Sequence, residues 1–150
     1  MNPDDFDRAA GDSREQQEAE GFLVAALSNR AGVELRRRDF EDPEGEWLEV
    51  DGYCDSPLIL CEAWAHLGRP KSAQKNKVMA DAFKLLYLER LISKPAQKVL
   101  LFADEAAARH FRGRSWMARA LKGYGIEVQV VELPEEIRAA VRKAQQRQFR

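Results

Sequence analysis

Residues 58–65 (LILCEAWA) form an almost continuous apolar run that a single carboxylate, Glu62, interrupts. A short apolar run between turn residues is typical of a strand at the centre of a sheet, covered on both faces. Such a strand is stable only when other elements pack on both of its sides. The run therefore predicts a layered α/β fold.

The segments around this run alternate between helical and extended patterns. Helices are expected over residues 14–30, 72–92 and 105–122, with a last helix opening at Pro134, and further strands over residues 33–40, 47–54, 98–103 and 126–133. The order αβββαβαβα predicts a three-layer αβα fold with a central mixed sheet. Residues 1–12 are expected to be a flexible acidic tail, and residues 13–150 a single domain.

Composition narrows the class of protein. The chain is 45% hydrophobic and 33% charged, which is typical of a globular protein. Its apolar runs are too short to cross a bilayer and its start is acidic, so we expect a cytoplasmic protein with no membrane partner. Cys54 and Cys61 lack the spacing and histidine partners of a zinc site and are expected to be buried free thiols.

The net charge of −1 hides an asymmetry along the chain. Residues 1–70 contain 7 Lys and Arg against 17 Asp and Glu, a balance of −10, and residues 71–150 contain 17 against 8, a balance of +9. Opposite balances indicate either internal charge pairing or an acidic site bordered by a basic surface that suits a polyanion.

Two of the acidic residues inside expected strands stand out, because a buried carboxylate is costly unless it is paired or binds a metal. These are Asp51 and Glu62. If residues 47–54 and 58–65 form a hairpin, the two side chains can meet on adjacent strands and hold Mg²⁺ or Mn²⁺ through oxygen ligands. Alternatively, Glu62 pairs with an arginine of a neighbouring strand, Arg36 or Arg38.

The pattern Glu49-Val-Asp51-Gly52, followed after a short gap by Leu60-Cys-Glu62-Ala-Trp64, resembles the core of the PD-(D/E)XK nucleases. This resemblance implies a restriction-endonuclease-like fold in which Asp51 and Glu62 are metal ligands. The lysine of the motif falls on Trp64, which has no cation. In some members the next helix supplies this lysine, so Lys75 and then Lys71 are candidates, with Gln74 beside them as a residue that contacts a carboxylate, a water or a phosphate.

The expected helix over residues 105–122 mixes cations with aromatic residues, in the stretch from Arg109 to Arg119. Such a mixture can bind phosphates and stack on bases. It is equally typical of a solvated helix face whose aromatic residues, Phe111 and Trp116, lie in the core.

The resemblance and the acidic pair together predict a metal-dependent nuclease that hydrolyses DNA. Small nucleases of this type often cut two strands as dimers, so the resemblance also suggests a homodimer. The departure at Trp64 favours an alternative, a catalytically inactive nuclease-fold protein that serves as a nucleic-acid-binding or protein-interaction subunit. A third interpretation, a small-molecule-binding unit starting at Lys98, lacks a Gly-rich phosphate loop after Ala103 and ranks last.

Overall fold

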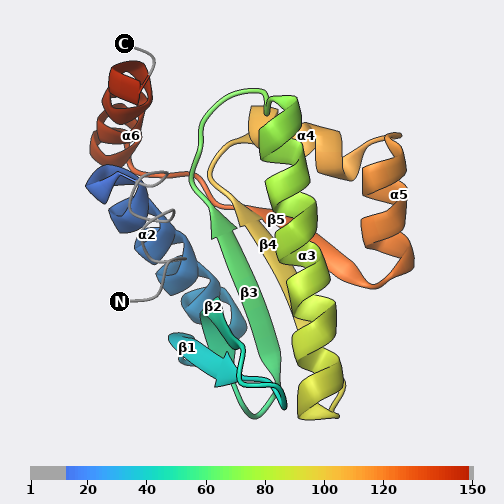
Figure 1. The fold of residues 1–150 in the computed structure, drawn as a ribbon. Helices are drawn as coiled ribbons and strands as arrows, with labels where there is room; N and C mark the ends of the chain where they lie inside the picture. Colours follow the sequence, from blue (N-terminus) through green and yellow to red (C-terminus); the bar gives the residue numbers. More distant parts are fainter. Residues whose placement is uncertain (1–12, 149–150) are drawn as a thin grey trace.

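The computed structural model describes residues 13–148, so the expected tail over residues 1–12 lies outside the described residues. A five-stranded mixed sheet in the order β1-β2-β3-β4-β5 forms the middle layer (Figure 1). Its strands are β1 (Arg36–Glu41), β2 (Trp47–Cys54), β3 (Ile59–Trp64), β4 (Gln97–Phe102) and β5 (Ile126–Val130). The β1-β2 and β2-β3 pairs are antiparallel, whereas β3-β4 and β4-β5 are parallel.

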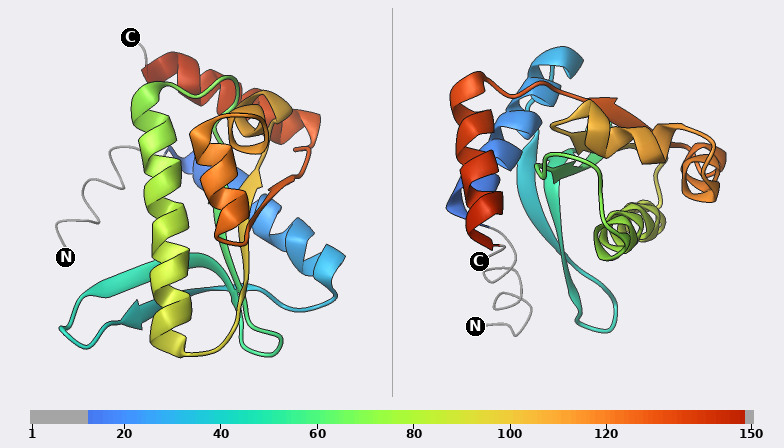
Figure 2. Two further views of the ribbon diagram at one scale, coloured as in Figure 1. Left: turned by 90° about the vertical axis from the view of Figure 1, so that its right-hand side faces the viewer. Right: turned by 90° about the horizontal axis from the view of Figure 1, so that it is seen from above.

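Helices cover both faces of the sheet, as the view from above in Figure 2 shows. One face packs on α2 (Arg14–Ala31) and α6 (Glu135–Gln148), and the other on α3 (Ser72–Ile92), α4 (Glu105–Arg112) and α5 (Trp116–Gly123). The α/β class, the mixed sheet and the layers are thus as predicted. No helix in the described part of the chain is long and apolar enough to cross a membrane.

The prediction of a single helix over residues 105–122 is wrong, because the chain forms two helices there. Gly113 ends α4, and the Ser115 side chain accepts a hydrogen bond from the Ala118 backbone N–H and so begins α5. Serine at this position satisfies a backbone donor that the first helical turn leaves free. The break lets Phe111 pack in the core while Trp116 is exposed.

Strand β3 is the centre of the sheet and all six of its residues are buried. Alternate residues of a strand face opposite sides. Cys61 and Ala63 accordingly lie in the core under α2, whereas Leu60 and Trp64 lie in the core under α3. Glu62 shares the parity of Leu60 and Trp64 and therefore faces α3. Cys61 is buried and Cys54 partly buried, and both are free thiols, as expected apart from the partial exposure of Cys54.

A β-bulge interrupts β2 beside Glu62. Arg36 is opposite Tyr53 and Arg38 is opposite Val50, so a single residue of β1, Arg37, faces two residues of β2, Asp51 and Gly52. The extra residue changes the side to which the following side chains point. A Cβ at Gly52 would lie only 3.2 Å from Val24 Cγ1 of α2. Glycine therefore fits the position of the bulge where β2 approaches α2.

Candidate functional site

Glu62 is buried at the centre of the molecule, with 5% of its surface exposed. A carboxylate at this depth is unfavourable unless another group compensates its charge. Three other ionisable side chains surround it, namely Asp51 of β2 and Asp81 and Lys84 of α3. The four residues form what we call the acidic cluster.

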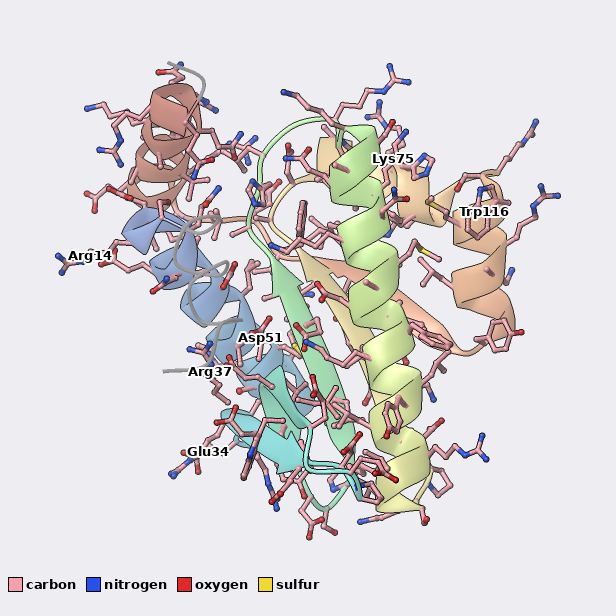
Figure 3. All side chains as sticks on the ribbon, in the orientation of Figure 1. Arg14, Glu34, Arg37, Asp51, Lys75 and Trp116 are labelled. Atoms are coloured by element: carbon pink, nitrogen blue, oxygen red, sulfur yellow. The ribbon has the colours of Figure 1, made fainter. Side chains whose placement is uncertain are left out.

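Asp51 enters the acidic cluster through the bulge of β2. The pairing of β2 with β3 runs from Cys54 opposite Ile59 to Gly52 opposite Cys61, so the next register position would set Asp51 opposite Glu62. There the Asp51 side chain accepts a hydrogen bond from the Ala63 backbone N–H, with a distance of 2.9 Å between Oδ2 and N. Asp51 thus satisfies a donor of the central strand with its carboxylate, which fixes this carboxylate next to Glu62. Figure 3 shows Asp51 beside the middle of β3.

Lys84 is the cation of the acidic cluster. Its Nζ lies 2.8 Å from Glu62 Oε1 and 3.9 Å from Asp81 Oδ1, and its side chain is 20% exposed. The contact with Glu62 is an ion pair, and Oε1 is a buried oxygen that has no hydrogen-bond partner within residues 13–148. A helix residue in the middle of α3 therefore holds an ammonium group directly over the central strand.

Burial and the neighbouring charges shift the pKa values of the acidic cluster. Burial and then the Asp51 charge raise the pKa of Glu62 well above its usual range, and the Lys84 ammonium opposes this rise. Burial lowers the pKa of Lys84, but the charges of Glu62 and Asp81 outweigh it, so the pKa is raised. Burial, followed by the charges of Asp51 and Glu62, raises the pKa of the Cys61 thiol well above its usual value. The acidic cluster therefore brings three acids and a single cation together around a buried glutamate.

The acidic cluster suits a divalent cation by its chemistry. Three carboxylates and one ammonium give a charge of −2 when all four groups are ionised, and Glu62 Oε1 is a buried acceptor without a hydrogen bond among residues 13–148. Within the same residues no three His, Cys, Asp or Glu side chains are arranged to hold a metal ion. Asp51 and Glu62 would thus supply two protein ligands. Mg²⁺ is commonly held by one or two carboxylates, with waters and substrate phosphates completing its shell.

The lysine beside Glu62 is Lys84, not Lys75 or Lys71. Lys75 lies nine residues before Lys84 on α3, a distance of about 13 Å along the helix axis. Figure 3 shows it at the end of α3 that is remote from Asp51. Gln74 does not reach the acids either, because its Oε1 accepts a hydrogen bond from the Lys71 backbone N–H at 2.9 Å. Lys71, Gln74 and Lys75 lie at the start of α3 and not at the acidic pair, which corrects the prediction for these three residues.

Trp64 stands where the motif would have a lysine, and it belongs to the core. It is 7% exposed, its ring centroid lies 4.4 Å from that of His66, and Lys77 Nζ lies 5.9 Å from its ring centroid. The alternative partners of Glu62 are also elsewhere, since Arg36 pairs with Glu34 and Arg38 lies over the rings of Phe40 and Tyr53.

Lys84 and Asp81 were not predicted from the sequence. Both are partly buried positions beside the buried face of α3, which consists of Val78, Ala82, Leu85 and Leu88. Their spacing of three residues sets them next to each other on the helix. An acid and a lysine at this spacing, beside an apolar stripe, were the available signal, but nothing in the sequence gives the level at which α3 crosses Glu62.

No protein-family model and no curated protein matches the chain. Among solved structures, the chain is similar to a repair endonuclease from Pyrococcus abyssi, with a TM-score of 0.45 and 14% sequence identity over 82% of this chain. The chain spans 50% of the length of that protein. A likeness at this level transfers neither a fold family nor an activity, so the case for a function depends on the chain's own side chains.

Proposed function

We propose that the protein is a metal-dependent nuclease of the PD-(D/E)XK, restriction-endonuclease-like class, which hydrolyses phosphodiester bonds in DNA. Asp51 and Glu62 hold Mg²⁺ or Mn²⁺, and Lys84 takes the role of the lysine that Trp64 does not supply. The observation that supports this proposal is the position of Lys84 Nζ, 2.8 Å from a buried Glu62 whose strand neighbour is Asp51.

Each residue has a distinct task in this proposal. The hydrogen bond from the Ala63 backbone N–H holds the Asp51 carboxylate next to Glu62, at the position where the two residues would share an ion. A divalent ion at the pair would supply a hydroxide nucleophile at neutral pH and stabilise charge on a phosphate. Lys84 donates to a phosphate oxygen and stabilises the negative charge that grows there during hydrolysis. Asp81, at the edge of the cluster, positions the Lys84 ammonium.

The experiment is a cleavage assay with plasmid and single-stranded DNA in Mg²⁺, in Mn²⁺ and in chelator. We expect cleavage in either metal, none in chelator, and a loss of at least about a hundredfold in Asp51→Asn and Glu62→Gln. Asp39→Asn is the matched control, because Asp39 is an exposed carboxylate of β1 outside the acidic cluster. Cleavage that Asp51→Asn and Glu62→Gln leave undiminished would sink the assignment of these residues.

One observation favours a second candidate, a catalytically inactive nuclease-fold protein that binds nucleic acid or another protein. The charges of Lys84 and Glu62 already compensate each other in an ion pair, which is also how a buried acid is stabilised without a metal. This candidate predicts salt-sensitive DNA binding that chelator does not change, and no cleavage by the purified protein. Metal-dependent cutting that Asp51→Asn abolishes excludes it.

A further inference from the structure

The molecule has a basic surface that the proposed metal site does not use. Residues 66–79, between β3 and the first turns of α3, contain four Lys and Arg and no Asp or Glu. Residues 105–124, which form α4 and α5, contain five Lys and Arg and one acid, Glu105. Glu105 pairs with Arg112 at 3.2 Å. The basic surface consists of Arg69, Lys71, Lys75, Lys77, Arg109, Arg112, Arg114, Arg119 and Lys122.

Its two segments lie against each other, and Figure 2 shows α4 and α5 beside α3. The backbone N–H of Gly68 donates to Asp104 Oδ2 at 2.6 Å, which ties the loop before α3 to the start of α4. Burial, then the positive charges of Lys75 and Arg69, lower the pKa of His110 on α4. Cations of the first segment therefore act on a residue of the second, so the two groups of positive charges lie near each other, an arrangement that attracts a polyanion.

An exposed tryptophan lies within the basic surface. Trp116 is the first residue of α5 and is 63% exposed, whereas its neighbour Met117 turns inward, with its Sδ 3.3 Å from His110 Nε2. Arg119, three residues later, is adjacent to Trp116 on the helix surface. Figure 3 shows the indole at the outer end of α5, among nitrogen-tipped side chains. An exposed indole among cations offers an aromatic face on which a base can stack while its phosphates contact the basic side chains.

Cations connect this surface with the acidic cluster along α3. Lys84 contacts Glu62, and Lys77, seven residues earlier, lies over the ring of Trp64, two residues beyond Glu62 on β3. Residues seven apart share one helix face and are separated by about 10 Å along the axis. A DNA strand that runs along these lysines from the acidic cluster would reach Lys75 and the segment that contains α4 and α5.

From this arrangement we infer that the basic surface binds a single-stranded DNA segment, with Trp116 stacking on an unpaired base and the surrounding lysines and arginines contacting phosphates. Base faces are accessible to an indole only where bases are unpaired, and stacking of this kind is tolerant of sequence. The inference rests on the proposed function in one respect: it names the strand form that the nuclease would hold next to its metal site.

The test measures binding in chelator, where no turnover occurs. Labelled oligothymidylate and a duplex of the same length are titrated with wild-type protein, Trp116→Ala, Trp116→Phe and Trp47→Ala. Trp47 is the matched control, because it is an exposed tryptophan (57%) on β2, outside the segments that form the basic surface. Circular dichroism of each variant verifies the fold.

We expect the wild type to prefer the single strand. Trp116→Ala weakens single-strand binding about tenfold, Trp116→Phe restores most of it, and Trp47→Ala binds as the wild type does. Arg119→Ala lowers the slope of log affinity against log salt by about 0.7, the value for one phosphate contact on a single strand. Equal affinity for duplex, or a Trp116→Ala variant that binds like the wild type, overturns the inference. This test measures binding and not cleavage, so its result does not depend on the outcome of the nuclease assay.

Discussion

At the scale of single residues, the contact between Lys84 and Glu62 determines what the acidic pair can do. In the sheet alone, Asp51 and Glu62 are two close carboxylates, and burial followed by the Asp51 charge raises the pKa of Glu62. The Lys84 ammonium at 2.8 Å compensates part of this charge, and in the proposed nuclease it donates to a phosphate oxygen. Asp81 keeps the ammonium in place from one helical turn away.

Replacing Lys84 by methionine keeps the length of the side chain and removes its charge. We expect Lys84→Met to lower kcat by about a hundredfold to a thousandfold with little change in KM, because the lost interaction strengthens as charge grows on the phosphate. Lys75→Met is expected to raise KM instead, since Lys75 lies on the basic surface. Steady-state kinetics on labelled DNA separate the two. An unchanged kcat in Lys84→Met contradicts the role given to this residue.

The raised pKa of Glu62 also predicts how stability depends on pH without metal. The folded protein binds this proton more tightly than the unfolded chain does. The stability that the proton contributes is complete below the unfolded pKa and is lost as the pH rises toward the folded pKa. As the pH rises from about 5, the melting temperature of Glu62→Gln should therefore fall less than that of the wild type. Glu136→Gln, on an exposed part of α6, should keep the wild-type slope.

At the scale of elements, the bulge in β2 sets the geometry of the site. It places Asp51 next to the last pair of β2 and β3, Gly52 opposite Cys61, and it brings Gly52 against α2. A methyl group at Gly52 would lie 3.2 Å from Val24 Cγ1 and 3.3 Å from Cys61 Sγ, both in the packed core. The position thus joins the packing of α2 to the placement of Asp51.

Gly52→Ala should destabilise the protein by about 1–3 kcal/mol, the usual cost of overfilling a packed core. Gly21→Ala is the contrasting variant, because Gly21 lies in α2 with no atom within 4 Å of the added methyl group. It should stabilise the helix by about 0.5–1 kcal/mol. Urea denaturation gives both values, and a Gly52→Ala variant as stable as the wild type would show that β2 does not depend on this close approach.

Sequence patterns predict the strands and helices better than they predict the pairing between strands. The apolar run around Leu60 and the turn before it predict β3 within one residue at each end, because a buried strand must be apolar and bounded by turns. The helix break at Gly113 was not predicted, although a glycine two residues before the capping Ser115 is a signal for it. The bulge at Asp51 was not predicted either, because it depends on the register of β2 with β1.

At the scale of the whole molecule, packing of distant segments assembles the site. Asp51 and Glu62 are eleven residues apart and could be paired from the sequence, whereas Lys84 reaches them only because α3 runs back along β3. The uneven charge of the two halves has a spatial counterpart: the acidic cluster takes two of its carboxylates from the acidic half, and the basic surface on α3, α4 and α5 comes mostly from the basic half.

The central claim is that Asp51 and Glu62 together hold a divalent ion, and a calorimetric titration with Mn²⁺ tests it without requiring turnover. We predict that the wild type binds a single ion per chain through this pair. Asp51→Asn and Glu62→Gln should lose this binding, and Asp39→Asn should retain it. Heats of binding in Asp51→Asn and Glu62→Gln that match those of the wild type would contradict the account.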